Sequence, residues 1–373
     1  MSEPVVAAVE TTTVSLRAKP ALKVQGARTT HDASTFVLVR VLTDEGVAGY
    51  GEVSATAAWS GEDEVTATHY VRDLIGPLLV GRPLAPVAAH TALLDRYLGG
   101  NPFTKAGVNT ALWDALGRTL GLPVATLLGG PFREEVPVKI SLSGDGDELR
   151  AGYEAAVALG FRAFKVKVGR EPRTDAARVA LARELAGDDA YVGADANGGW
   201  TRADAARAIR AMAPSRLAFV EQPVRAADLE GMRDLRALGV PVVADEAVYS
   251  DADVIRVAQL GAADVVSVYV GKSSGLERAV RSAALAGLHG LEVVIGSNGE
   301  MGIGAAAQAH VACACERLGS APCGIIGHHF YEDEEEPTLK TPVDIDGVRA
   351  RLPAGPGLGV EPTEETVRRF SSR

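Results

Sequence analysis

The feature that most constrains the fold is a repeat in the middle of the chain, where short apolar segments alternate with amphipathic ones. Stretches such as Thr201–Ala213 and Gly275–His289 have helical spacing, and the apolar segments have the length of buried strands. Alternating strands and helices predict parallel βαβ units. The predicted strands are Val136–Leu142, Ala163–Val168, Tyr191–Asp195, Ala218–Glu221, Val242–Asp245, Val265–Tyr269, Glu292–Gly296 and Cys323–Gly327. Because no dinucleotide-binding fingerprint accompanies them, the pattern favours a closed barrel over a doubly wound sheet.

The segment before this repeat, residues 1–130, has the pattern of a small α+β domain. Thr35–Leu42 and Val47–Val53 are strand-like and flank a turn at residues 43–46, which predicts a hairpin. Helical segments follow at Glu64–Leu79 and Lys105–Leu120. Gly129-Gly130-Pro131 then marks a boundary.

The segment after the repeat consists mostly of turns and short strands. Its acidic run, residues 332–336, predicts a solvated loop, with a metal site as the alternative. The run Gly355–Gly359 resembles a phosphate-binding loop in its glycines alone, because no strand precedes it, so a plain turn is expected. The predicted division of the chain is therefore 1–130, 131–327 and 328–373.

Composition excludes several classes of protein. The 373 residues are 47% hydrophobic and 23% charged, which is typical of a globular chain of about two domains. The net charge of −10 argues against nucleic acid or an anionic membrane as a partner. The N-terminus lacks a leader pattern and no apolar run reaches membrane-spanning length, so a soluble, cytoplasmic protein is expected. Cys313, Cys315 and Cys323 match no zinc-binding spacing and are expected to be buried thiols.

Three successive predicted strands end in a carboxylate. These are Asp195, Glu221 and Asp245, which are 26 and 24 residues apart, one βα unit each. In a parallel barrel the strands end on one rim, so the three side chains converge there. Converging carboxylates repel one another unless a cation neutralises them, and all-oxygen ligation favours Mg²⁺. The alternative is that each acid caps a helix or pairs with a nearby base.

A pair of lysines lies one strand before this series. Lys165 and Lys167 are two residues apart on a strand, so both point to the same face. Two lysines inside a barrel are costly unless they have a purpose. Ammonium groups crowded beside a divalent cation have lowered pKa values, and such a lysine can act as a general base. Metal and lysine together predict removal of the proton alpha to a carboxylate.

These motifs resemble the enolase superfamily, and the muconate lactonizing enzyme subgroup in particular. The resemblance rests on Lys165-Val166-Lys167, Asp195-Ala196-Asn197, Glu221-Gln222-Pro223 and Asp245-Glu246, and on residues 111–117, 127–130 and 355–360. It implies a modified (β/α)7β barrel with an N-terminal α+β capping domain. It also implies Mg²⁺, with Mn²⁺ as an alternative, on Asp195, Glu221 and Asp245. Lys167 would be the acid/base, and Lys165 would tune it or contact substrate.

The resemblance also implies where substrate binds. Ser297, Asn298 and Glu300, at the end of the seventh strand, are expected to contact it, together with Asn197 and Lys272. Trp59 lies in a segment that resembles the substrate-selecting loop of the capping domain. The expected partners are a small-molecule carboxylate and further copies of the chain in a homo-oligomer, with no nucleic acid and no membrane.

The sequence departs from the subgroup at two places, and a third observation disfavours another type of the superfamily. The sixth strand usually ends in a second catalytic lysine, but here Tyr269 holds that position and Lys272 falls three residues later. On the eighth strand, Gly324 and Ile326 replace the Asp-x-Asp of dipeptide epimerases, so a dipeptide substrate is not expected. No histidine ends the seventh strand, which disfavours the mandelate racemase type.

The sequence leaves three hypotheses. The first is an isomerase or lyase, of the cycloisomerase or dehydratase type, with Lys167 as the main acid/base. The second is a racemase or epimerase of amino-acid derivatives, in which Tyr269 acts opposite Lys167. The third is a non-catalytic barrel that binds a ligand.

Overall fold

The computed structural model describes residues 3–27, 29–331 and 338–371. Its N-terminal part is built on an antiparallel sheet of β1 (Val6–Arg17), β4 (Ala33–Thr43) and β5 (Ala48–Val53), in the order β1-β4-β5. The predicted hairpin is present as β4–β5. β1 was missing from the sequence prediction, although its Val- and Thr-rich sequence suits a strand, and it pairs with β4 from end to end.

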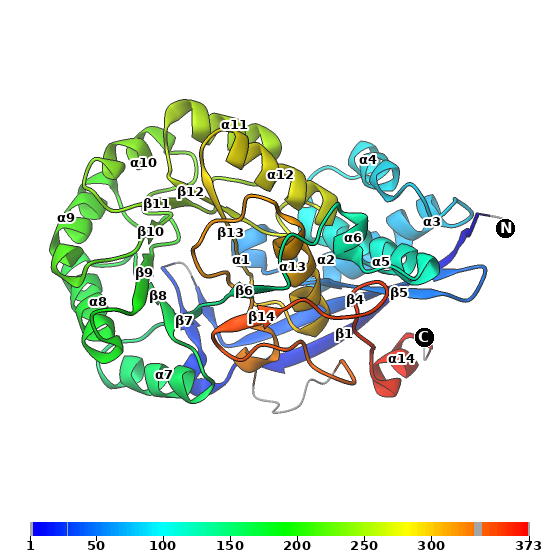
Figure 1. The fold of residues 1–373 in the computed structure, drawn as a ribbon, viewed down its shortest axis with the longest axis horizontal. Helices are drawn as coiled ribbons and strands as arrows, with labels where there is room; N and C mark the ends of the chain where they lie inside the picture. The colour runs from blue at the N-terminus through cyan, green and yellow to red at the C-terminus, as the bar shows by residue number, and fades with distance from the viewer. Residues whose placement is uncertain (1–2, 28, 332–337, 372–373) are drawn as a thin grey trace.

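Helices cover one side of this sheet and, with it, form the cap (Figure 1). The predicted helix over residues 64–79 contains a π-helical turn at Tyr70–Ile75. The helix α5 (Pro102–Leu120) packs closely against β5 through glycines. A Cβ on Gly51 would lie 1.9 Å from the Gly107 carbonyl oxygen, so a larger residue would not fit there. The helices of the cap are α1 (Ala57–Ser60), α2 (Glu64–His69), α3 (Gly76–Leu79), α4 (Val87–Tyr97), α5 (Pro102–Leu120) and α6 (Val124–Leu127), and its second, short hairpin is β2 (Val24–Gln25) with β3 (Thr30–His31).

The middle of the chain forms a curled parallel sheet of seven strands in the order β13-β12-β11-β10-β9-β8-β7, with helices around its outside (Figure 1). The strands are β7 (Ile140–Leu142), β8 (Ala163–Lys167), β9 (Tyr191–Asp195), β10 (Val220–Glu221), β11 (Val242–Ala244), β12 (Val265–Val268) and β13 (Glu292–Ile295). The helices are α7 (Asp147–Ala158), α8 (Pro172–Ala186), α9 (Arg202–Met212), α10 (Leu229–Arg236), α11 (Asp251–Leu260), α12 (Leu276–Leu288) and α13 (Gly302–Ala314).

Residues 323–324 close the barrel where the eighth strand was predicted. Cys323 bridges Val138, and the Gly324 N–H donates to the Ile295 carbonyl at 2.7 Å. These are isolated pairings, so the eighth strand is shorter than expected. The fold is the expected (β/α)7β barrel with a cap.

The C-terminal segment lies against both parts of the molecule. β14 (Arg349–Arg351) pairs with β6 (Glu135–Pro137), and α14 (Glu364–Ser371) packs on β1. The glycine-rich run at residues 355–359 is a turn, anchored where the Leu358 N–H donates to Asp114 at 2.7 Å. The acidic run at residues 332–336 lies outside the described residues. The division at residues 130 and 327 stays a prediction.

The interior matches the composition of the chain. Cys313, Cys315 and Cys323 are free and buried, as expected. Within the described ranges, no helix is both long enough and apolar enough to cross a membrane.

Candidate active site

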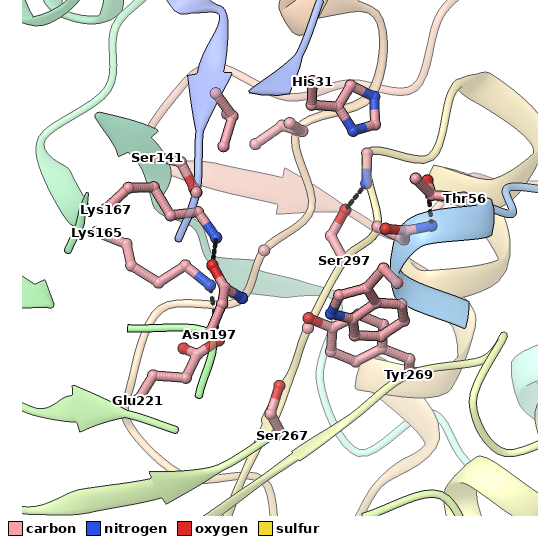
Figure 2. A pocket seen from close by; sticks show the side chains of 18 of the residues that line it. His31, Thr56, Ser141, Lys165, Lys167, Asn197, Glu221, Ser267, Tyr269 and Ser297 are labelled. Atoms are coloured by element: carbon pink, nitrogen blue, oxygen red, sulfur yellow. Dashed lines mark hydrogen bonds and ion pairs between the residues drawn. The ribbon is translucent and has the colours of Figure 1, made fainter. Parts of the chain in front are cut away.

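A cavity of about 140 Å³ lies between the cap and the ends of the barrel strands. The cap contributes Val24, Gly26, Thr29, His31, Thr56, Ala58 and Trp59 to its wall. The barrel contributes Lys139, Ser141, Lys165, Lys167, Asn197, Glu221, Ser267, Tyr269, residues 296–299, Gly324 and Ile326, and Phe330 follows them. Figure 2 shows Lys165 and Lys167 on one side of the cavity, with Tyr269 and Ser297 facing them across it.

The two lysines of β8 reach the cavity from the same face of the strand, as predicted. The Lys167 Nζ donates to Asp195 Oδ2 at 2.7 Å and to Asn197 Oδ1 at 3.0 Å. The Lys165 Nζ lies 2.7 Å from Glu221 Oε1 and 3.0 Å from Asp195 Oδ2. Burial alone would lower the pKa of Lys165, but these carboxylates outweigh it and raise that pKa.

The three strand-end carboxylates are brought to one rim. Asp195 and Glu221 are the last residues of β9 and β10 and are paired across them, while Asp245 directly follows β11. All three are at most 2% exposed. Burial disfavours the charge of Asp195, but Lys165 and Lys167 hold its pKa below the usual value. Buried carboxylates so close together need cations, and here lysines supply them.

The three carboxylates are the kind of ligand that a hard divalent cation prefers. The oxygens are all carboxylate, they come from adjacent strands, and the neighbouring Glu246 carries a buried Oε2 without a hydrogen-bond partner in the described residues. Among the residues that the structure describes, no three His, Cys, Asp or Glu side chains are grouped closely enough to hold a metal ion without rearrangement. Each of the three carboxylates instead contacts an ammonium group.

Tyr269 lies at the end of β12, on the side of the cavity that faces the lysines (Figure 2). Its hydroxyl donates to Asp245 Oδ2 at 2.9 Å, and its ring stacks on Trp59 at 5.5 Å between centroids. Burial, reinforced by the surrounding carboxylates, raises the pKa of Tyr269 well above its ordinary value. The group is therefore placed as a hydrogen-bond donor and not as a base.

Lys272 does not lie where substrate contact requires. It is 1% exposed, is absent from the cavity wall, and donates to Asp245 Oδ1 at 2.5 Å and to the Ser267 carbonyl at 2.8 Å. The turn that follows β12 carries its side chain back beneath Tyr269. The expectation that Lys272 binds substrate is thus corrected, since a nearby buried carboxylate retains its ammonium.

Comparison with known proteins agrees with this geometry. Residues 8–129 match the family described as mandelate racemase/muconate lactonizing enzyme, N-terminal domain, and residues 148–366 match the enolase C-terminal domain-like family. The chain belongs to the enolase superfamily. Within it, the muconate lactonizing enzyme-like subgroup is the match, as the sequence motifs indicated.

The relatives of this enolase-superfamily member include enzymes with different reactions. Muconate cycloisomerase 1 of Rhodococcus opacus is 33% identical over 92% of this chain and 93% of its own. The N-succinyl-L-Arg/Lys racemase of Bacillus cereus is 30% identical over 90% of each chain. The muconate lactonizing enzyme from Pseudomonas fluorescens, solved with muconolactone, superposes with a TM-score of 0.91 at 30% identity, covering 99% of this chain and 100% of that one. The protein is an enzyme similar to the muconate cycloisomerases, which sets aside a non-catalytic binding barrel.

The residues that follow the seventh strand of this enzyme, β13, have two roles: some line the cavity and one supports the turn. Ser297 and Asn298 line the cavity. Glu300 does not, because its carboxylate turns inward and accepts hydrogen bonds from the Ser297 hydroxyl, the Asn298 N–H and the Gln308 amide. Burial raises the pKa of Glu300. Glu300 thus orders the turn, and its predicted contact with substrate is corrected.

Two ionisable residues of the cavity wall of this enzyme were not anticipated. His31, on the short cap hairpin, lines the wall and is hydrogen-bonded through Nε2 to Ser34. Burial, and then the charge of Lys167, lowers the pKa of His31. Lys139 is buried beside β7, where burial and the charge of Lys165 lower its pKa to about 8. The sequence held a signal for Lys139, because it lies two residues before Ser141 in an apolar strand. The two side chains therefore share a face, and Ser141 also lines the cavity.

Proposed function

We propose that this enzyme removes the proton alpha to the carboxylate of a small-molecule substrate, as a cycloisomerase or dehydratase. Lys167 is the acid/base, and Asp195, Glu221 and Asp245 hold Mg²⁺. Support comes from the site chemistry and from relatives named as muconate cycloisomerases. Residence in the cytoplasm and homo-oligomer formation remain predictions.

The observation that carries the proposal is how Lys167 is held. A neutral amine has two N–H bonds and one lone pair, and the Lys167 Nζ has two acceptors, Asp195 Oδ2 and Asn197 Oδ1. When both N–H bonds are used there, the remaining tetrahedral position carries the lone pair. Among the described residues that position has no further acceptor, and because Lys167 lines the cavity it can take a substrate proton.

The neighbouring groups support the same chemistry. Mg²⁺ bound at the three carboxylates would supply positive charge to the substrate carboxylate as the proton leaves. Lys165 places a second ammonium group in the wall, where it can contact the same anionic end of the substrate. Trp59, Ile326 and Phe330 add apolar surface that excludes water from the reacting carbon.

One-base chemistry fits the two sides of the cavity. In a syn elimination, Lys167 takes the alpha proton and then returns a proton to the leaving hydroxide, which departs as water. Cycloisomerisation likewise needs one proton transferred on one face. A racemase or epimerase needs a second base on the opposite face, and there the Tyr269 hydroxyl is already donating to Asp245. Gly324 and Ile326 offer no carboxylate to the amino group of a dipeptide.

The test is proton exchange followed by NMR in D₂O with Mg²⁺. A panel of hydroxy acids, unsaturated acids, lactones and N-acylated amino acids would be incubated with the enzyme and with Lys167→Ala. We expect one class to lose its alpha-proton signal with the parent enzyme and to keep it with the variant. If both proteins exchange equally, Lys167 is not the base, and racemisation without loss of water or ring formation would select the second hypothesis.

A further inference from the structure

The Lys167 amine donates hydrogen bonds to two side chains, the proposed metal ligand Asp195 and the amide of Asn197. Asn197 adopts a left-handed backbone conformation, with φ of 44°, directly after the β9 strand end. Its Nδ2 donates to Glu246 Oε1 at 2.9 Å while its Oδ1 accepts from Lys167. Because Glu246 Oε1 is the acceptor in this contact, the amide presents its NH₂ to Glu246 and its oxygen to Lys167.

Glu246 is held in turn from the cap. The Trp59 Nε1–H donates to the same Oε1 at 3.2 Å. The indole is fixed by neighbouring rings, being stacked on Tyr269 and edge-on to Phe103 at 5.6 Å. Glu246 does not line the cavity, and its Oε2 has no hydrogen-bond partner in the described residues. Both of its side-chain hydrogen bonds thus converge on one oxygen.

A second cap segment also closes on Asn197. A Cβ on Gly26 would lie 3.2 Å from Asn197 Oδ1, so the glycine lets this segment approach the amide closely. The Arg170 guanidinium, in the loop after β8, donates to the Gly26 carbonyl at 2.9 Å and keeps the segment in place. The cap therefore contacts the Asn197–Glu246 pair through two separate stretches of chain.

We infer that Trp59 and Glu246 are positioning residues which, through the Asn197 amide, fix the direction of the Lys167 amine. The inference rests on the proposed role of Lys167 as the base. With the relay intact, both N–H bonds of the neutral amine have fixed acceptors and its lone pair has one direction. Without it, the amide can rotate and turn its NH₂ toward Lys167, so that Asp195 alone holds the amine. The packing of the cap on the barrel then determines the direction of the Lys167 lone pair.

The chain offers a matched control for Trp59. Trp113, in cap helix α5, also donates its indole N–H to a glutamate of the barrel, Glu277 of α12, at 2.7 Å. Trp59→Phe and Trp113→Phe each remove one indole–carboxylate hydrogen bond between cap and barrel. Only the first bond leads to Lys167. Glu246→Leu removes the shared acceptor, whereas Glu246→Gln keeps an oxygen at the Oε1 position and should rescue.

The first readout needs no substrate. Trinitrobenzenesulfonate, a reagent for neutral amines, would be applied to the full-length protein, and labelling of Lys167 and Lys139 would be compared by peptide mass spectrometry. Lys139 is the internal standard, because it lines the same cavity but donates to the Pro322 carbonyl and not to Asn197. We expect the Lys167/Lys139 ratio to change in Trp59→Phe and Glu246→Leu and to match the parent in Trp113→Phe and Glu246→Gln. An unchanged ratio in Glu246→Leu, or an equal change in Trp113→Phe, overturns the inference.

The second readout is catalytic. With the acid found by the exchange screen, kcat should fall about tenfold in Glu246→Leu, as expected for one lost hydrogen bond to a charged group, while KM stays nearly constant. A fall in Glu246→Gln equal to that in Glu246→Leu would show that the charge matters and not the acceptor, which contradicts the relay. Failure of the parent enzyme to exchange any acid would instead refute the proposed function, and the labelling ratio would still decide the relay.

Discussion

The ammonium of Lys272 lies 4.1 Å from the centre of the Tyr269 ring, and both side chains bind the carboxylate of Asp245. Their order along the turn after β12 places the phenol on the cavity wall and the cation behind it. The sixth strand therefore places a hydroxyl at the cavity wall where the subgroup usually has a second catalytic lysine, as the sequence indicated. This exchange decides what the side opposite Lys167 can do.

Removing the Tyr269 hydroxyl should separate proton abstraction from the later step. In Tyr269→Phe, we expect alpha-proton exchange in D₂O to continue while product formation falls about 10- to 100-fold, the worth of a hydrogen bond to a charged group. NMR follows both rates in one sample. Tyr249→Phe is the control, because its ring also lies near Trp59 but outside the cavity wall. Full activity of Tyr269→Phe would leave packing as its only role, and loss of exchange would favour the epimerase.

Lys272→Met should destabilise the enzyme, because it leaves Asp245 buried without its cation. Breaking a buried ion pair from one side costs about 3–5 kcal/mol in the free energy of unfolding. Mg²⁺ should restore part of this loss by taking over the charge compensation. Urea unfolding with and without Mg²⁺ measures both effects, with the exposed Lys340→Met as control. Equal stability of Lys272→Met and parent would refute the structural role.

Mg²⁺ should stabilise the folded enzyme and EDTA should reverse the effect. A ligand at 100 times its Kd adds about 2.7 kcal/mol to the free energy of unfolding, which is visible as a rise in Tm. Glu221→Gln should lose this response, since a carboxylate ligand is gone, while Glu292→Gln, on the exposed start of β13, should keep it. A Tm rise of the same size in Glu221→Gln would place the metal elsewhere.

Lys167→Ala should abolish turnover without unfolding the protein. General acid–base catalysis contributes about 10²–10⁴-fold, so kcat should fall by at least that range. Circular dichroism and the urea midpoint report whether the fold is retained. The effect of Lys165→Ala on kcat should vary more from substrate to substrate, because this variant changes the charge around Lys167 and leaves the base itself in place. Near-parental activity in Lys167→Ala would exclude it as the base.

Much of the architecture followed from local pattern. The βα repeat predicted the barrel strands within a few residues, because a buried parallel strand needs a continuous apolar run and its helix an apolar stripe. The strand ends Asp195, Glu221 and Asp245 could be placed on one rim for the same reason. β1 was missed, and the eighth strand is reduced to isolated pairings, because both depend on contacts with distant segments.

What tertiary structure decided is which side chains reach the cavity. The sequence by itself determined that Lys165 and Lys167 share a face, since strand geometry fixes that. It did not determine that Lys272 folds back to Asp245, that Glu300 turns inward, or that His31 enters from the cap. The relay from Trp59 through Glu246 and Asn197 joins residues far apart in the chain. Hydrogen bonds of this kind form only after the cap and barrel have packed, so no local periodicity encodes them.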